Sequence, residues 1–108
     1  MALYMFQAAY ANEAWATQIR NPQNRAEQVR PIIEAFGGKL LSFYYAFGEY
    51  DVVAIMEAPD NVSVSALAIA VAGGGAMKAQ KTTVLMSVEE GLEAMRRASR
   101  AGYRPPGG

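Results

Sequence analysis

The sequence contains no histidine and no cysteine, and these two absences exclude much catalytic and metal chemistry. Without cysteine the chain has no disulfide, no thiolate nucleophile and no thiolate-held zinc or iron–sulfur centre. Without histidine it has no Ser-His-Asp triad, no imidazole base and no ordinary haem ligand. The acidic residues also lack the spacing that is typical of a metal site. We therefore expect no bound metal and no cofactor.

An excess of charge of either sign is also missing. Ten lysine and arginine residues balance ten aspartate and glutamate residues. A nucleic-acid-binding surface usually shows as a basic excess, so we expect no nucleic-acid partner. The longest apolar run falls short of the roughly 20 residues that span a membrane, and no basic leader precedes the first apolar residues. We therefore expect a cytoplasmic protein without a membrane partner.

Apolar and aromatic residues are what the chain has in excess: 52% of its 108 residues are hydrophobic and 10% are aromatic. The length supports one domain, and a domain of this size exposes much of its surface. The excess indicates a surface that meets another subunit or a ligand, or else an alanine-rich helical composition that raises the count harmlessly. The end of the chain is too rich in glycine and proline to fold alone, so we expect a domain over 1–101 and a tail over 102–108.

Short apolar runs separated by turn residues predict four strands. These strands cover residues 3–10, 39–47, 50–57 and 77–87. The second and third flank Gly48 and Glu49, which is typical of an antiparallel hairpin. We expect Gly48 to hold a turn conformation that would strain any other residue.

Capping residues and apolar stripes predict the helices, which cover residues 13–20, 22–36, 62–72 and 88–100. Each begins at a side chain that can accept a hydrogen bond from a first-turn amide: Asn12, Asn21, Asp60 and Ser87. Pro22 and Glu90 strengthen two of these starts, as the first helical residue and as the partner in a capping box. Pro31 removes a helical hydrogen bond, so we expect a kink or a break there.

This order predicts an α+β fold of the ferredoxin-like βαββαβ type with an extra C-terminal helix. Two helices would cover one face of a four-stranded antiparallel sheet, and the other face would stay open. Residues of the strand over 39–47 are apolar on both faces, with Leu41, Phe43, Tyr45 and Phe47 on one and Leu40, Ser42, Tyr44 and Ala46 on the other. Apolar surface on both faces needs cover on both. We therefore predict a homodimer or larger symmetric oligomer through the open face; the alternative is that the last helix or the tail folds across it.

The hairpin segment Phe47-Gly48-Glu49-Tyr50-Asp51-Val52-Val53 resembles the turn after which the GYD-domain family of small bacterial proteins is named. The Asn21-Pro22 start with Arg25 and the later Lys81-Thr82-Thr83 segment also resemble that family, and the resemblance covers roughly residues 3 to 95. It implies the dimeric α+β barrel fold. Similar barrels include monooxygenases, isomerases and decarboxylases, which is an analogy of fold alone.

Asp51 directly follows the turn and is the candidate proton acceptor at the mouth of a cavity. Tyr44 or Tyr50 would donate to a developing oxyanion. These three residues are the candidate catalytic set of a cofactor-independent enzyme. The alternative is that Gly48, Tyr50 and Asp51 only shape the hairpin.

Aromatic side chains near the strand ends and the first helix are the candidate ligand-binding residues. Together with one arginine they are Tyr10, Trp15, Arg25 and Tyr45. The function that we expect is binding of a small apolar or aromatic molecule in a cavity between sheet and helices, with or without catalysis. The alternatives are a scaffold protein that docks a partner enzyme through its oligomer surface or tail, and aromatic residues that serve only as core.

Overall fold

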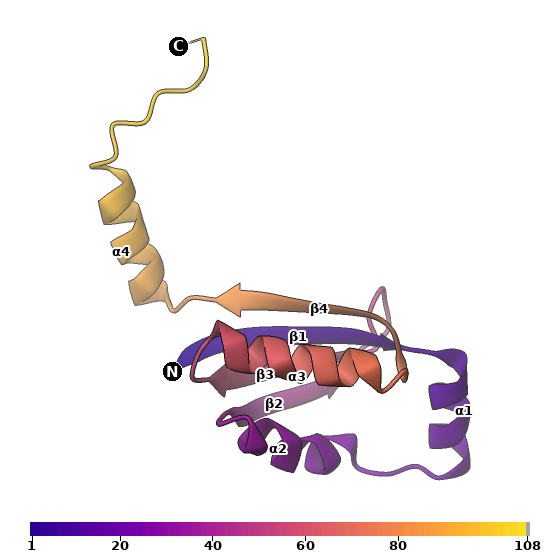
Figure 1. The fold of residues 1–108 in the computed structure, drawn as a ribbon. Helices are drawn as coiled ribbons and strands as arrows, with labels where there is room; N and C mark the ends of the chain where they lie inside the picture. The colour runs from indigo at the N-terminus through magenta and orange to yellow at the C-terminus, as the bar shows by residue number, and fades with distance from the viewer. Residues whose placement is uncertain (108) are drawn as a thin grey trace.

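The computed structural model describes residues 1–107, which form four strands and four helices (Figure 1). In chain order these are β1 (Ala2–Tyr10), α1 (Asn12–Arg20), α2 (Arg25–Ala35), β2 (Lys39–Tyr45), β3 (Val52–Ala58), α3 (Asn61–Gly73), β4 (Met77–Leu85) and α4 (Val88–Ala98). The strands make one antiparallel sheet in the order β2-β3-β1-β4. The predicted α+β class, the ferredoxin-like arrangement and the antiparallel hairpin of β2 and β3 are confirmed.

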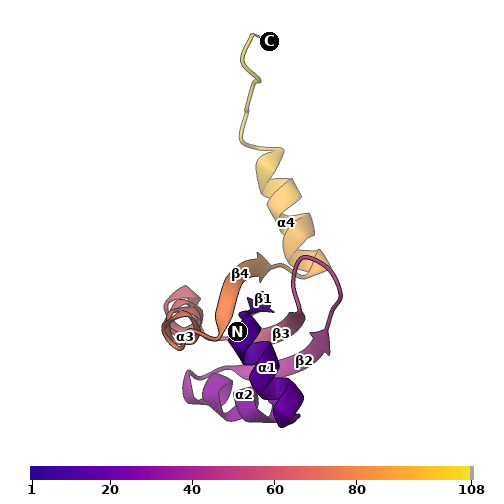
Figure 2. The ribbon, with the colours of Figure 1, turned by 90° about the vertical axis from the view of Figure 1, so that its right-hand side faces the viewer.

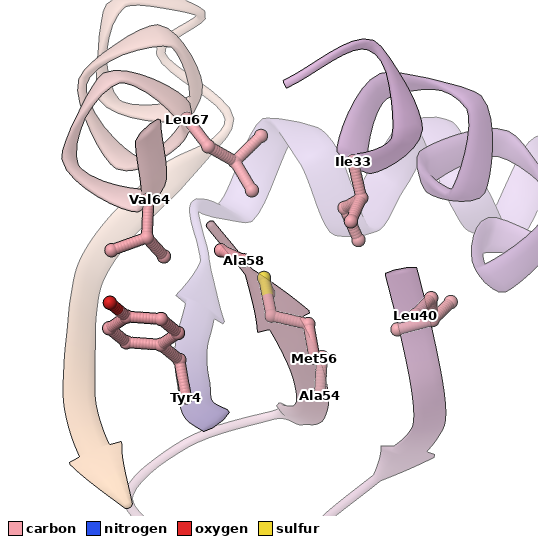
Figure 3. Packing of buried hydrophobic residues seen from close by; sticks show 8 residues of the cluster. All are labelled: Tyr4, Ile33, Leu40, Ala54, Met56, Ala58, Val64 and Leu67. Atoms are coloured by element: carbon pink, nitrogen blue, oxygen red, sulfur yellow. The ribbon is translucent and has the colours of Figure 1, made fainter. Parts of the chain in front are cut away.

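Helices α2 and α3 cover one face of this sheet, and the hydrophobic core lies between them and the strands (Figure 2). Figure 3 shows Val64 of α3 facing Tyr4, and Ile33 of α2 facing Leu40. Burial of an apolar side chain of this size contributes roughly 1.5–3 kcal/mol. The buried Tyr4 hydroxyl donates to Asn61 Oδ1 at 2.7 Å, so it enters the core with its hydrogen bond satisfied.

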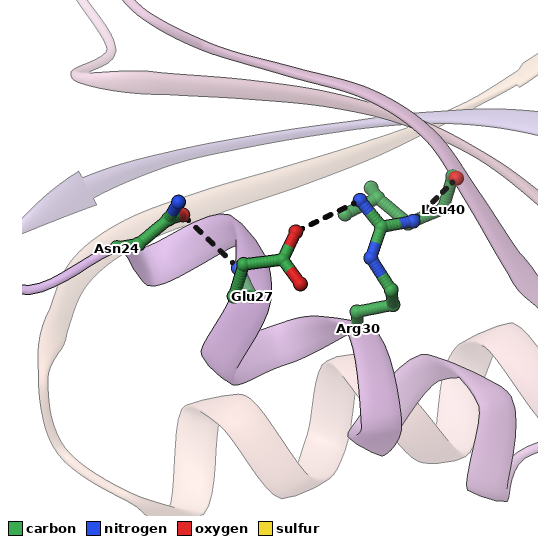
Figure 4. Close-up of polar contacts among 4 residues, drawn as sticks. All are labelled: Asn24, Glu27, Arg30 and Leu40. Carbon is green, nitrogen blue, oxygen red and sulfur yellow. Dashed lines mark hydrogen bonds and ion pairs between the residues drawn. The ribbon is translucent and has the colours of Figure 1, made fainter.

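Two helix starts differ from the prediction. Helix α1 begins at Asn12 itself and follows Ala11, whose methyl side chain cannot cap. Helix α2 begins at Arg25 rather than at Pro22, because Asn24 supplies the cap: its Oδ1 accepts from the Glu27 amide at 3.1 Å (Figure 4). The expected caps at residues 12 and 21 are therefore wrong. Several Asn residues of equal capping strength stand close together here, and the sequence does not rank them.

The other helix signals agree with the structure. Asp60 Oδ1 accepts from the Ser63 amide at 2.8 Å and opens α3, and Ser87 and Glu90 form the predicted capping box of α4. Helix α2 continues through Pro31 to Ala35, so the predicted break does not occur. Pro31 is exposed, on the side away from the core, where a lost hydrogen bond is replaced by water.

Strand β2 contains a register shift between Leu40 and Ser42 that the predicted alternation missed. Leu40 pairs with Met56 and Phe43 pairs with Ala54, so both β2 residues point toward the helices, while Leu41 is exposed. The grouping of residues 41, 43, 45 and 47 on one face is therefore wrong, because one extra residue in a bulge reverses the alternation. Position 47 lies beyond the strand, which ends at Tyr45.

Gly48 is not the strained turn position that we expected. The glycines with positive φ in residues 1–107 are Gly37, Gly75, Gly102 and Gly107, and a Cβ added at Gly48 would meet no atom within 4 Å. The hairpin is instead closed by a backbone hydrogen bond from the Ala46 amide to the Asp51 carbonyl at 2.8 Å. The longer loop between β2 and β3 does not need a left-handed residue.

The second face of the sheet, here called the open face, carries the alternate strand residues. From β2 to β4 it consists of Lys39, Ser42, Tyr44, Val53, Ile55, Glu57, Leu3, Met5, Gln7, Lys81, Thr83 and Leu85. Its centre on β1 and β3 is mostly apolar, and its charged residues lie at the ends and the edge. Within residues 1–107 no helix covers this face (Figures 1 and 2).

Helix α4 projects away from the sheet (Figure 1). The alternative prediction, in which the last helix folds across the open face, is therefore wrong. The radius of gyration is 17.4 Å, whereas a compact chain of this length has about 13 Å. The apolar side of α4 is solvent-exposed, with Val88, Leu92 and Met95 all uncovered. None of the helices in the described part of the chain is both long and apolar enough to traverse a lipid bilayer.

Candidate functional site

A cavity of about 290 Å³ lies between the covered face of the sheet and helices α2 and α3. Phe6, Phe43 and Val52 form its floor on β1, β2 and β3, and Val29 and Val71 stand on the helices opposite. Nearly all of the wall is therefore apolar.

Small residues explain why this space stays unfilled. Ala70 on helix α3 and Gly74, which directly follows this helix, line the cavity one turn apart, and Ala76 lines it from the turn before β4. Ala54 on β3 is equally small. Protein interiors normally close such gaps with larger side chains. Here the side chains on both sides are too short to meet.

Two polar side chains, Tyr10 and Arg25, line one end of the cavity. Tyr10 ends β1 and is 3% exposed. Burial raises the pKa of its phenol, and the neighbouring Arg25 guanidinium opposes that rise. Tyr10 is therefore a neutral hydroxyl at pH 7. Arg25 opens α2, and its Nη1 donates to Gln28 Oε1 at 2.7 Å.

Asp51 lies next to this end of the cavity but is not part of its wall. Its Oδ2 accepts from the Tyr10 amide at 2.9 Å and from Trp15 Nε1 at 3.3 Å. The Trp15 ring meets the Tyr10 ring edge-on, with centroids 5.1 Å apart and planes at 71°. The Asp51 carboxylate thus ties the β2–β3 loop to the end of β1 and to α1. This contact positions the cavity residue Tyr10.

Trp15 and Tyr45 line a second, shallower hollow of about 280 Å³ beside α1. Gln18, Ile19, Pro22 and Gln23 complete its wall. The hollow is joined to the main cavity by aromatic contacts, since Tyr45 meets Phe43 edge-on at 5.7 Å and Phe43 is on the cavity floor. The four predicted ligand-binding residues are therefore neighbours, divided between two adjoining hollows.

The three candidate catalytic residues do not converge at the cavity. Tyr44 pairs with Val53 on the open face and is 62% exposed, so the sheet separates it from the cavity. Tyr50 lies half-buried in the loop between β2 and β3. Asp51 is held by its two donors outside the cavity wall.

Sequence reasoning missed the contribution of α3 to the site. Val71, Ala70 and Gly74 all face the cavity. A usable signal was present, because small residues four positions apart in a helix lie on the same side and leave room there. Across residues 1–107 the acidic side chains form no group of three that could hold a metal ion.

Comparison with known proteins gives a family and a fold. The family model described as GYD domain matches residues 4–95. A solved structure described as "crystal structure of FFRP-DM1" is similar, with a TM-score of 0.50 and 12% sequence identity over 80% of this chain and 100% of that chain. At that identity the likeness concerns the fold alone. No curated protein matches the chain.

Proposed function

The chain belongs to the GYD-domain family, and we propose that it binds a small apolar or aromatic molecule in the cavity between its sheet and helices α2 and α3. The observation that carries this proposal is the wall: apolar side chains on both sides, with Arg25 and Tyr10 together at one end. Such a combination, mostly apolar with a few convergent polar groups, is typical of small-molecule sites. The volume of about 290 Å³ suits a compact ligand.

Filling the cavity is energetically favourable for two reasons. Apolar side chains that face a void lose the dispersion contacts that a neighbouring group would give them. Water in an apolar space has few hydrogen-bond partners, so an apolar ligand replaces it at little cost. Phe6 and Phe43 offer flat ring surfaces to an aromatic or alkyl group.

Binding rather than catalysis is the activity that this geometry supports. Asp51 already accepts two hydrogen bonds, and it lies outside the wall. Tyr44 is on the other face of the sheet. A reaction in the cavity would have to use the Tyr10 hydroxyl or the Arg25 guanidinium, which suit recognition of a polar end of the ligand.

The same proposal includes a homodimer or larger symmetric oligomer through the open face. Leu3, Met5, Val53 and Ile55 occupy the centre of that face on the two middle strands. Stacking two copies would remove this apolar area from water. Replacement of central Ile55 by Glu is expected to dissociate the assembly in analytical ultracentrifugation, whereas Val62→Glu, an exposed position on α3, leaves it intact. A monomeric wild type would refute this part.

The binding experiment compares two phenylalanine substitutions on α3. Val71→Phe places a ring in the cavity, and Ile69→Phe, at an exposed position of the same helix, is its matched control. Isothermal titration uses 4-phenylbutan-1-ol as the probe. We expect wild type and Ile69→Phe to bind it with similar affinity, and Val71→Phe to lose binding while its circular dichroism stays unchanged.

Two results would count against the cavity as a binding site. The first is equal binding to all three proteins, which places the probe elsewhere. The second is the absence of binding to wild type together with no co-purified small molecule in native mass spectrometry. The second result would favour the scaffold hypothesis, for which the exposed apolar side of α4 is the supporting observation.

A further inference from the structure

Arg25 is the single charged side chain on the cavity wall among the residues that the structure describes. Every other wall residue except Tyr10 is apolar or glycine. A guanidinium beside so much apolar surface is less hydrated than one on an open surface, and it interacts more strongly with an opposite charge. The Arg25 guanidinium is therefore a candidate partner for an anionic group inside the cavity.

The chain itself supplies no such anion to Arg25. The three ion pairs found in residues 1–107 are formed by Arg30, Arg96 and Arg97. Arg25 instead donates to the neutral Gln28 side chain through Nη1. A guanidinium has five N–H donors in a planar fork. Donors therefore remain for a group brought by a ligand.

Tyr10 adds a second donor at the same end of the cavity. Burial raises the pKa of its phenol, so the hydroxyl stays protonated and can donate to an anion. The Asp51 carboxylate holds the Tyr10 amide and the Trp15 indole, and so keeps the strand end in place. Tyr10 on β1 and Arg25 on α2 thus both offer hydrogen-bond donors at the same end of the cavity.

The cavity runs from this polar end toward the core along β1. Phe6 lies four residues before Tyr10 on the same strand face, a distance of about 13 Å at the usual rise of a strand. Met56 and Ile33 lie at the far end, next to the packed core. The space is therefore amphiphilic along its length, with donors at one end and apolar walls over the remainder.

We infer that the ligand is a monocarboxylate with an alkyl or aryl tail, whose carboxylate is bound by Arg25 and Tyr10 and whose tail lies along Phe6 and Phe43. The inference rests on the proposed binding function and adds the chemical class of the ligand. A carboxylate is planar and can accept two parallel hydrogen bonds from one guanidinium, which makes this pairing specific as well as strong. The apolar lining disfavours a second charge at the other end, because the described wall residues there offer it no partner.

A matched pair of probes tests the inference: 4-phenylbutyrate and 4-phenylbutan-1-ol differ only in the terminal group. We expect wild type to bind the carboxylate at least about tenfold more tightly than the alcohol in isothermal titration, because the hydrogen bonds are charge-assisted. In Arg25→Gln this ratio should fall to near one, because the carboxylate loses its charge-assisted partner while the apolar walls remain. Arg25→Lys keeps the charge without the fork and should give an intermediate ratio.

Arg30→Gln is the control for a lost positive charge on the same helix. Arg30 contacts Glu27 and the Leu40 carbonyl (Figure 4), outside the cavity wall, so the ratio should equal that of wild type. Equal affinity of wild type for both probes, or an unchanged ratio in Arg25→Gln, would overturn the carboxylate inference while leaving the binding function intact. Absence of binding of either probe to wild type, together with no co-purified small molecule in native mass spectrometry, would overturn both.

Discussion

Replacement of Asp51 by alanine tests whether this residue holds the site together. Its Oδ2 accepts two hydrogen bonds, from the Tyr10 amide and from Trp15 Nε1. Hydrogen bonds to a charged group contribute about 1.5–3 kcal/mol, and a donor left unpaired in a partly buried place costs a similar amount. The two bonds share one acceptor and do not add fully. We expect Asp51→Ala to lower the free energy of unfolding by about 2–3 kcal/mol.

Urea unfolding followed by tryptophan fluorescence measures this loss directly, because Trp15 is the only tryptophan and is one of the two donors. All samples need the same protein concentration, since an oligomer unfolds in a concentration-dependent way. Asp51→Asn keeps one acceptor oxygen and should lose less. Glu49→Ala, at an exposed position of the same loop, should stay within about 0.5 kcal/mol of wild type. A loss in Asp51→Ala no larger than in Glu49→Ala would refute the positioning role.

Two further predictions concern the ends of the structure and its pH dependence. A chain that ends at Ser87 should keep the sheet signal in circular dichroism and a cooperative unfolding transition, because α4 buries no residue; loss of the transition would show that α4 belongs to the core. Burial raises the pKa of Tyr10 above its ordinary value of 10.0, so its stabilising contribution is complete below that pH and is lost as the pH rises through the higher folded value. Tyr10→Phe should therefore lose less stability than wild type in urea titrations between about pH 9 and 11, the range around the ordinary pKa of a tyrosine. Equal slopes of stability against pH in the two proteins would contradict the shift.

Much of the fold was predictable because local and global signals agree. Strand β3 alternates buried and half-buried residues along its whole length, and Asp60 and Ser87 cap the helices that they were expected to open. The failures have local causes. The bulge after Leu40 depends on pairing with β3, which one strand does not specify by itself. The start of α2 depends on which of two neighbouring Asn residues caps the helix, and the Asn24 side chain is the one that accepts from a first-turn amide.

The site was predictable in its aromatic residues but not in its shape. Tyr10, Trp15 and Tyr45 lie close together because β1, α1 and the end of β2 meet at one end of the sheet. The sequence also suggests Tyr44 as a donor in the same cavity, yet neighbouring strand residues point to opposite faces, and Tyr44 lies on the open face. The cavity itself depends on how far α3 stands from the sheet. That distance follows from packing between elements far apart in the chain.

The small residues around the cavity bear on whether it is a binding site or a packing defect. Apolar side chains that face an unfilled space lose the dispersion contacts that a neighbouring group would give them, so this space does not help the empty domain to fold. Ala54, Ala70, Gly74 and Ala76 come from β3, α3 and the turn into β4, and larger side chains from any of these places would reduce the space. Departures from close packing of this kind are expected at functional sites. Under the proposed function, a ligand that fills the cavity would restore the missing contacts and stabilise the domain in proportion to its occupancy, and larger side chains at these four positions would weaken its binding.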